Sequence, residues 1–332
     1  MRTTRHIFAV DSHTMGEPTR IVVGGFPMIP GRSMAEKMAV LRDRHDDFRR
    51  ALMLEPRGHR DMFGCILLPP ADPEADLGVV FMDGDGYLTM CGHGSIGAVT
   101  VALEMGLVER REPETSLALD TPAGLIRARA RVENDAVTAV SIENVPAFLY
   151  REGERLEVPG IGTVSVDIAF GGNFFALASA EEIGIEIAPK RVRELVDVGM
   201  RILVRAREAL PVCHPTLAHV SSIDLVEIHG RGPSGSHRNI VVFGQGQFDR
   251  SPCGTGTCAR MAALHAKKQL ALGEEFVHES VIGTRFVGRL LRETTVGGLP
   301  AVSPEITGQA FITGFQQFVL DPADPLRNGF LV

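Results

Sequence analysis

Hydrophobic and polar positions alternate or recur at helical spacing along most of the chain, and they predict a mixture of strands and helices. A capping box followed by apolar residues at helical spacing predicts a helix over 33–53. Similar spacing predicts helices over 92–105, 189–208 and 255–268. Short apolar runs predict strands at 7–10, 19–23, 62–68, 78–82, 163–169, 173–177, 222–229 and 239–243. The pattern is that of an α+β protein.

In residues 125–132 the odd positions include three arginines, and the even positions are apolar. Arg127, Arg129 and Arg131 share one face, and no aromatic residue lies between them, so we interpret this face as a solvated strand surface rather than a nucleic-acid stripe. The polar segment 151–155 is our predicted linker. We therefore expect one domain of residues 1–150 with a C-terminal segment at about 312–332, and a second domain of residues 151–311.

A repeated segment is the most informative feature of the sequence. Val79-Val-Phe-Met-Asp-Gly84 precedes Met90-Cys-Gly-His-Gly-Ser-Ile-Gly97, and Val241-Val-Phe-Gly-Gln-Gly246 precedes Pro252-Cys-Gly-Thr-Gly-Thr-Cys-Ala259. Phe81 and Phe243, and likewise Cys91 and Cys253, are separated by the same 162 residues. The repeat predicts two similar halves, each with one cysteine where a strand gives way to a helix.

The start of a helix favours negative charge because its first N–H groups have no helical partner. We therefore expect the pKa of Cys91 and Cys253 to be lowered toward thiolate, and the glycines beside them to let a substrate carboxylate approach the backbone. Facing each other across an interdomain cleft, the two sulfurs would contact opposite faces of one α-carbon. One thiolate would remove the α-proton while the opposite thiol delivers another, inverting the carbon without a cofactor.

Composition narrows the function classes. The 332 residues are 44% hydrophobic and 23% charged, with a net charge of −7 and no tryptophan. Nucleic acid and anionic membrane are therefore poor candidates as partners. We expect no signal peptide and no membrane span. The five cysteines lack the close spacing of a disulfide framework, which favours a reducing cytoplasm.

Several segments together resemble the proline racemase family. They are Asp11-Ser-His-Thr-Met-Gly-Glu-Pro-Thr-Arg20, Glu55-Pro-Arg-Gly-His59, Met90-Cys-Gly-His-Gly94, Phe170-Gly-Gly-Asn173, His214-Pro-Thr-Leu-Ala-His219 and Asp249-Arg-Ser-Pro-Cys-Gly-Thr-Gly-Thr257. This family includes 4-hydroxyproline epimerase and trans-3-hydroxyproline dehydratase and shares its fold with diaminopimelate epimerase. The resemblance implies two pseudo-symmetric domains, each a curved sheet around a central helix, and a homodimer that uses no cofactor.

The resemblance also implies roles for individual residues. Cys91 and Cys253 would be the acid–base pair. Asp249 and His93 would contact the substrate amine, and the backbone of Gly92, His93, Gly254 and Thr255 would hold the carboxylate. Phe63 and Phe243 resemble the aromatic pair that closes on an unsubstituted proline ring. They offer no hydrogen bond to a ring hydroxyl, which favours proline over 4-hydroxyproline. The dehydratase branch typically carries threonine in place of the second cysteine, so Cys253 argues against it.

Other interpretations give different functions. Gly92–Gly97 fits the dinucleotide pattern G-x-G-x-x-G, which would suggest an NAD-dependent oxidoreductase, but the motif occurs twice and each copy follows a cysteine. A non-catalytic amino-acid binding protein would use the same carboxylate cradle. A zinc site is not expected, because neither cysteine has a ligand partner at C-x-x-C spacing. We expect the remaining cysteines, Cys65, Cys213 and Cys258, to lie in the core. We expect His214, His219 and Glu17 to be structural residues.

Overall fold

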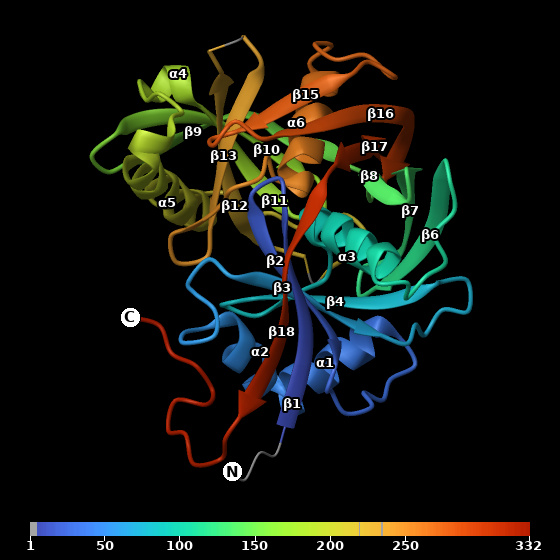
Figure 1. Cartoon of the computed structure of the whole chain (residues 1–332). Coiled ribbons are helices and arrows are strands. Elements are labelled where there is room, and N and C mark those ends of the chain that lie inside the picture. Colours follow the sequence, from blue (N-terminus) through green and yellow to red (C-terminus); the bar gives the residue numbers. More distant parts are fainter. Residues whose placement is uncertain (1–4, 219, 234) are drawn as a thin grey trace. The chain divides into compact units, whose positions relative to one another are not determined.

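The computed structural model describes residues 5–218, 220–233 and 235–332 (Figure 1). It divides into two compact units. Unit 1 comprises Met1–Ile142 and Gly308–Val332, and unit 2 comprises Glu143–Thr307. The chain therefore passes between the units twice. His219 lies outside the described residues.

Unit 1 contains a long series of paired strands. These strands are β1 (Arg5–Thr14), β2 (Glu17–Gly24), β3 (Phe63–Leu68), β4 (Leu77–Asp83), β5 (Tyr87–Leu88), β6 (Glu114–Thr121), β7 (Gly124–Glu133), β8 (Ala136–Glu143) and β18 (Ala310–Leu320). From β18 the pairing runs through β1, β2, β3, β4, β6, β7 and β8, with parallel steps only at β2–β3 and β4–β6. The hairpin strand β5 pairs with β4.

Unit 2 repeats this series. Its strands are β9 (Phe148–Val158), β10 (Gly162–Phe170), β11 (Phe174–Ser179), β12 (Ile223–Arg231), β13 (His237–Phe243), β14 (Gln247–Asp249), β15 (Phe276–Ser280), β16 (Arg285–Val296) and β17 (Leu299–Gly308). The parallel steps fall at the equivalent places, β11–β12 and β13–β15, and β14 forms the matching hairpin with β13. The repeat seen in the sequence is therefore a repeat of topology.

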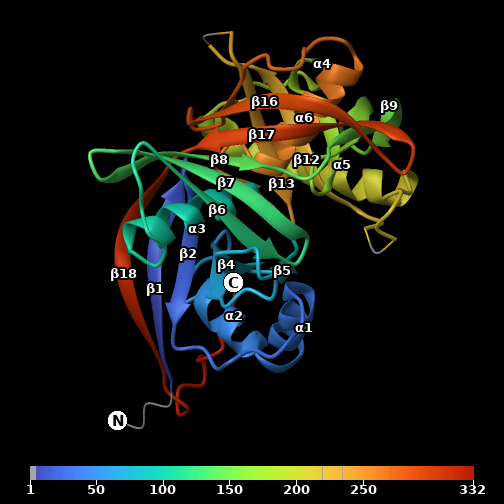
Figure 2. The same ribbon diagram turned by 90° about the vertical axis from the view of Figure 1, so that its right-hand side faces the viewer.

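Each unit has a central helix in the second parallel crossover. α3 (Gly92–Glu104) lies beside β1, β2 and β18 in Figure 2 and is buried from Gly92 to Leu103. α6 (Gly254–Ala266) contacts β9, β10, β11 and β16 and is buried on nearly every side. Helices that are apolar or small-sided all round belong inside a domain, and both sequences have this composition.

The remaining helices lie in the first parallel crossovers. In unit 1 these are α1 (Met34–Arg44) and α2 (Asp46–Met53), which pack on β4. In unit 2 they are α4 (Ala180–Ile183), the 3₁₀ turn η1 (Pro189–Arg191) and α5 (Val192–Ala209), and α5 packs on β12 and β13.

Two sequence predictions about elements are wrong. The helix expected over 33–53 breaks at His45, whose φ of −138° and ψ of 22° are not helical. A new helix starts at Asp46 and Asp47, because negatively charged side chains are stabilising at the N-terminal end of a helix. The polar segment 151–155 is not a linker but the middle of β9, paired with β10 across a register shift. Gly153, with a φ of 65°, accommodates that shift and donates its N–H to Asp167.

The solvated strand face is confirmed. Arg127, Arg129 and Arg131 of β7 are exposed, and Ile126, Ala128 and other intervening residues are buried. In the part of the chain that the structure describes, no helix is long and apolar enough to cross a membrane.

Candidate active site

Cys91 caps the N-terminus of the central helix of unit 1. Its sulfur accepts the N–H of Gly94 at 3.3 Å, and its carbonyl accepts both the N–H of Ser95 at 3.0 Å and the Ser95 hydroxyl at 2.7 Å. Only 7% of Cys91 is exposed. The sulfur is thus held where the amide groups of the first helical turn converge.

His93 lies against this sulfur. Its Nδ1 is 3.2 Å from Cys91 Sγ, and its ring meets the Phe63 ring edge-on with centroids 4.4 Å apart. The Thr14 hydroxyl fixes the backbone by donating to the His93 carbonyl at 2.9 Å. The structure therefore brings together three residues that the sequence singled out in unit 1.

A glycine is required at position 94, where the helix backbone lies against the Cys91 sulfur. A Cβ at Gly94 would lie 2.9 Å from Cδ1 of Phe81 and 3.3 Å from Cys91 Sγ. Because real Cβ atoms essentially never come within 3.0 Å of another heavy atom, the repeat residues Phe81 and Gly94 are matched to each other. This packing sets the approach of β4 to the helix start.

Cys253 caps the central helix of unit 2 with the same sulfur contact but a different backbone. Its sulfur accepts the N–H of Gly256 at 3.4 Å and lies 3.6 Å from the Thr255 hydroxyl. Its φ is 60°, in the left-handed region, whereas the φ of Cys91 is −149°. Strain of this kind persists only where surrounding contacts impose it.

Asp249 supplies part of that constraint. Its Oδ1 accepts the N–H and the hydroxyl of Ser251, both at 2.7 Å, and the Ser251 hydroxyl in turn accepts the Cys253 N–H at 3.1 Å. Phe243 packs against the apolar cluster that contains Cys253. Asp249, Thr255 and Phe243 are therefore gathered around Cys253, as their positions in the motifs suggested.

The expectation of a lowered thiol pKa is wrong for Cys253. Burial raises the pKa of this thiol well above its usual value, and the negative charge of Asp249 adds to the effect. The Gly256 N–H and the Thr255 hydroxyl act in the opposite direction but do not outweigh burial. Because its pKa is raised, Cys253 is a thiol near neutral pH and can donate a proton.

Sequence reasoning missed a polar layer behind Cys253. Glu227, Asn239 and His278 are fully buried beneath the first turn of α6. They are scattered over three strands of the second half, so no local motif joins them.

The other cysteines and histidines have mixed outcomes. Cys65 and Cys258 are fully buried, as expected, but Cys213 is exposed in the loop after α5. The loop buries Val212 and not Cys213, so the prediction of a core position is wrong for Cys213. His214 is structural, because its Nδ1 accepts the N–H groups of Thr216 and Leu217.

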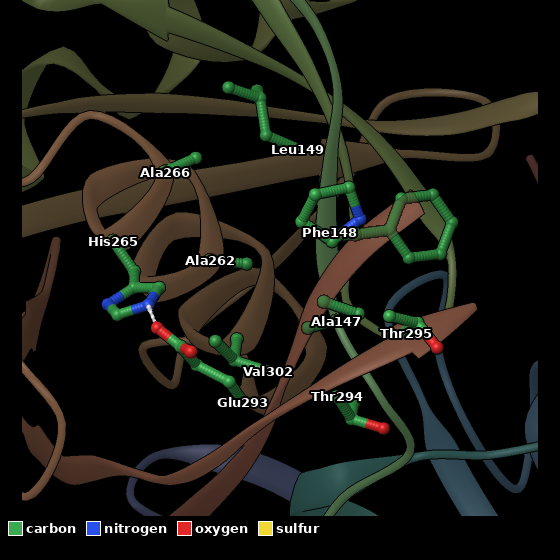
Figure 3. A pocket seen from close by; sticks show the side chains of 12 residues that line it. Ala147, Phe148, Leu149, Ala262, His265, Ala266, Glu293, Thr294, Thr295 and Val302 are labelled. Atoms are coloured by element: carbon green, nitrogen blue, oxygen red, sulfur yellow. Dashed lines mark hydrogen bonds and ion pairs between the residues drawn. The ribbon is translucent and has the colours of Figure 1, made fainter. Parts of the chain in front are cut away.

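A separate groove of about 650 Å³ lies elsewhere in unit 2. Figure 3 shows that its wall includes Ala262, His265 and Ala266 of α6, with His265 directed toward Glu293 of β16. The His265 Nε2 and Glu293 Oε1 atoms are 3.2 Å apart. No residue predicted for the active site lines this groove.

Among the described residues, no group of three or more histidine, cysteine, aspartate or glutamate side chains is arranged to hold a metal ion.

Two topologically equivalent units with a thiol at the start of each central helix define a fold of the racemase and epimerase type. The chain belongs to the proline racemase family, which it matches over residues 9–331. It is 54% identical to the proline racemase of Acetoanaerobium sticklandii and 49% identical to the 4-hydroxyproline 2-epimerase of Streptosporangium roseum, with 100% of each chain covered in both comparisons. A solved hydroxyproline epimerase from Agrobacterium vitis, with bound trans-4-hydroxy-L-proline, superimposes with a TM-score of 0.94 at 35% identity, covering 100% of this chain and 96% of that one.

These comparisons confirm the predicted family and the α+β fold, and they identify the protein as an isomerase. The roles of the individual site residues stay predictions.

Proposed function

We propose that the protein interconverts L- and D-proline without a cofactor, with Cys91 and Cys253 as the two acid–base groups. The observation that carries the proposal is the repeated arrangement of a sulfur that caps a central helix and accepts an amide N–H from its first turn. The similarity to a proline racemase at 54% identity supports proline as the substrate.

The chemistry requires one thiolate and one thiol. The thiolate takes the α-proton, and the electron pair of the broken C–H bond delocalises into the carboxylate. The opposite S–H bond breaks and its proton adds to the other face of the same carbon. When substrate binds, one sulfur is the base and the other is the acid, and after one inversion the two sulfurs have exchanged protonation.

The helix starts supply the electrostatic stabilisation. The N–H groups of Gly92, His93, Gly254 and Thr255 belong to first helical turns, where no carbonyl of the same helix accepts them. We assign them to the substrate carboxylate, which gains negative charge as the α-proton leaves. His93 and Asp249 are assigned to the secondary amine.

Phe63 and Phe243 support proline over 4-hydroxyproline. Phe63 is 4% exposed and packs on His93, and Phe243 packs in the cluster that contains Cys253. Neither ring can accept a hydrogen bond from a ring hydroxyl in the way an oxygen or nitrogen does, so binding hydroxyproline would leave that hydroxyl poorly solvated. The relatives named for hydroxyproline make the epimerase the competing function.

The experiment is to incubate the protein with L-proline and, separately, with trans-4-hydroxy-L-proline in D2O. Optical rotation and the α-proton NMR signal are followed over time. Faster turnover of proline is expected, and faster turnover of hydroxyproline would assign the epimerase reaction instead. A lack of exchange with both substrates would favour a binding protein.

We further propose a homodimer in a reducing, cytoplasmic environment, in which all five cysteines remain free thiols as they are in the structure. Light scattering measures the dimer directly, and a monomeric mass would contradict it.

A further inference from the structure

Glu227 is a buried residue next to the first turn of α6, the helix that Cys253 caps. It sits in the middle of β12 opposite Val241 of β13 and is completely buried. A Cβ built on Gly256 would be 2.7 Å from Glu227 Oε2, so the carboxyl touches the residue whose N–H contacts Cys253 Sγ. Only one residue of helix backbone separates the carboxyl group from the sulfur.

Most of the buried polar atoms near Glu227 that have no hydrogen-bond partner are acceptors, and the one donor among them is Nε of Arg260. Neither carboxyl oxygen has a hydrogen bond of good geometry, and the same is true of Asn239 Oδ1 and His278 Nε2. The Asn239 amide group donates to the Pro252 carbonyl at 2.8 Å and also acts on the Glu227 carboxyl, and His278 Nδ1 is engaged with the Thr257 hydroxyl at 3.0 Å. His278 Nε2 lies 3.6 Å from Glu227 Oε1. A proton on Glu227 gives the acceptors Asn239 Oδ1 and His278 Nε2 a further donor.

The surrounding charges agree with that proton. Burial raises the pKa of Glu227 to about 8, against the opposing effects of the Arg260 charge and the Asn239 side chain. Burial lowers the pKa of His278 well below its usual value, helped by Arg260 and by His237 and His229. Near neutral pH, Glu227 is therefore a neutral acid and His278 a neutral imidazole. Ionised Glu227 would raise the pKa of Cys253 still further.

Packing alone does not require a carboxyl group here. In unit 1 the corresponding pair is Leu67 of β3 opposite Val79 of β4, since Val79 and Val241 occupy equivalent places in the repeat. The equivalent position in unit 1 thus holds a partly buried leucine. A buried ionisable group costs stability, which favours a specific role at the Cys253 side.

The same layer holds the strained backbone of Cys253. The Pro252 carbonyl, one residue before Cys253, accepts from both the Asn239 amide and the Thr257 hydroxyl. These contacts tie Asn239 and Thr257, which lie beside Glu227, to the residue that precedes the unusual φ of Cys253.

We propose that Glu227 is a positioning residue that acts on Cys253 in its protonated form, and that its ionisation disfavours the Cys253 thiolate and slows turnover. The inference rests on the proposed racemase function, because a thiolate at Cys253 forms whenever that sulfur gives its proton to the substrate. A negative charge one residue away opposes that step. Cys91, with Leu67 in the equivalent place, is not subject to this control.

The test compares kcat/KM for L-proline from pH 6 to 10 in the wild type, Glu227→Gln and Asp224→Asn. Glutamine keeps a donor and cannot ionise. Asp224, also on β12, has a pKa raised by burial but is paired with Ser222 and Arg207, so it is the matched control. We expect the wild type to lose about tenfold between pH 7 and 9, as one group with a pKa near 8 ionises. Glu227→Gln is expected to lose less than about threefold through this group, and Asp224→Asn to follow the wild type. Superimposed profiles for Glu227→Gln and the wild type would overturn the proposal.

A second measurement separates this inference from the racemase proposal. The alkylation rate of Cys253, followed by mass spectrometry of its peptide with iodoacetamide, needs no turnover. Glu227→Gln is expected to alkylate faster than the wild type above pH 8, and equal rates would contradict the inference even if racemisation were absent. If the glutamine variant fails to fold, Glu227→Leu, which copies the arrangement in unit 1, takes its place. If neither folds, infrared titration of the wild type decides: a protonated-carboxyl band lost near pH 8 supports the proposal and its absence overturns it.

Discussion

Arg20 of β2 provides a quantitative test of how much a buried ion pair stabilises unit 1. Its guanidinium donates to both carboxylate oxygens of Asp11, at 2.8 and 2.9 Å, and to the carbonyls of Leu52 and Arg57, at 2.6 and 2.7 Å. Only 7% of the Arg20 side chain and 17% of the Asp11 side chain are exposed. A bidentate pair at such low exposure is little screened by water.

Replacing Arg20 by Met keeps much of the side-chain volume and removes every one of these donors. Breaking a buried ion pair by deleting one partner costs about 3–5 kcal/mol, because the other charge stays buried. For a body of the size of unit 1, that lowers the melting temperature by roughly 6–20 °C. Arg20→Lys keeps the charge but loses the fork geometry, so we expect an intermediate loss.

The assay is urea denaturation followed by circular dichroism, with Arg42→Met as the control. Arg42 also pairs with an aspartate, Asp43, but both side chains are more than half exposed, and such pairs contribute about 0–1 kcal/mol. If Arg20→Met and Arg42→Met have the same free energy of unfolding, the reasoning is refuted.

Two further predictions concern unit 2. A Cβ at Gly171 would overlap the Thr255 carbonyl and lie 2.5 Å from the Ala259 N atom, both in the backbone of α6. Gly171→Ala should therefore lower the free energy of unfolding by more than about 3 kcal/mol, measured by thermal unfolding. A melting curve equal to that of the wild type would contradict this. The pKa of Glu227 is raised from 4.5 to about 8 in the folded protein, so its neutral form stabilises the fold fully below pH 4.5, and this contribution is lost as the pH rises through 8. Relative to Glu227→Gln, the wild type should therefore lose up to about 5 kcal/mol between pH 4.5 and 8 and then level off, as measured by denaturation at a series of pH values, whereas a constant difference would contradict the assignment.

The sequence predicted the features that repeat or recur. Cys91 and Cys253 were found because the same local pattern appears twice, and a helix start has the same electrostatics wherever it occurs. The two helices followed from the helical spacing of their residues, and their central position followed from the family resemblance. Even so, the sign of the Cys253 pKa was wrong, because a local motif contains the helix N–H groups but not the burial that the rest of unit 2 imposes.

Features that depend on distant partners could not be predicted. The buried ion pair of Asp11 and Arg20 also depends on the carbonyls of Leu52 and Arg57, which accept hydrogen bonds from Arg20 and lie more than thirty residues away in the sequence. The burial of Glu227 depends on residues distant in the sequence, such as Gly256 of α6, and no local pattern indicates it. The segment 151–155 was assigned to a linker because its polar residues resemble a turn, although their backbone pairs with β10.

The central claim is that two thiols act on opposite faces of one α-carbon, and isotope exchange by Cys91→Ser and Cys253→Ser tests it most directly. Each variant is incubated separately with L- and D-proline in D2O, and both α-deuteration and inversion are measured. The account predicts that neither variant inverts the carbon and that each exchanges the α-proton of a single enantiomer, with opposite preferences. Full racemisation by either variant, or exchange of the same enantiomer by both, would contradict it.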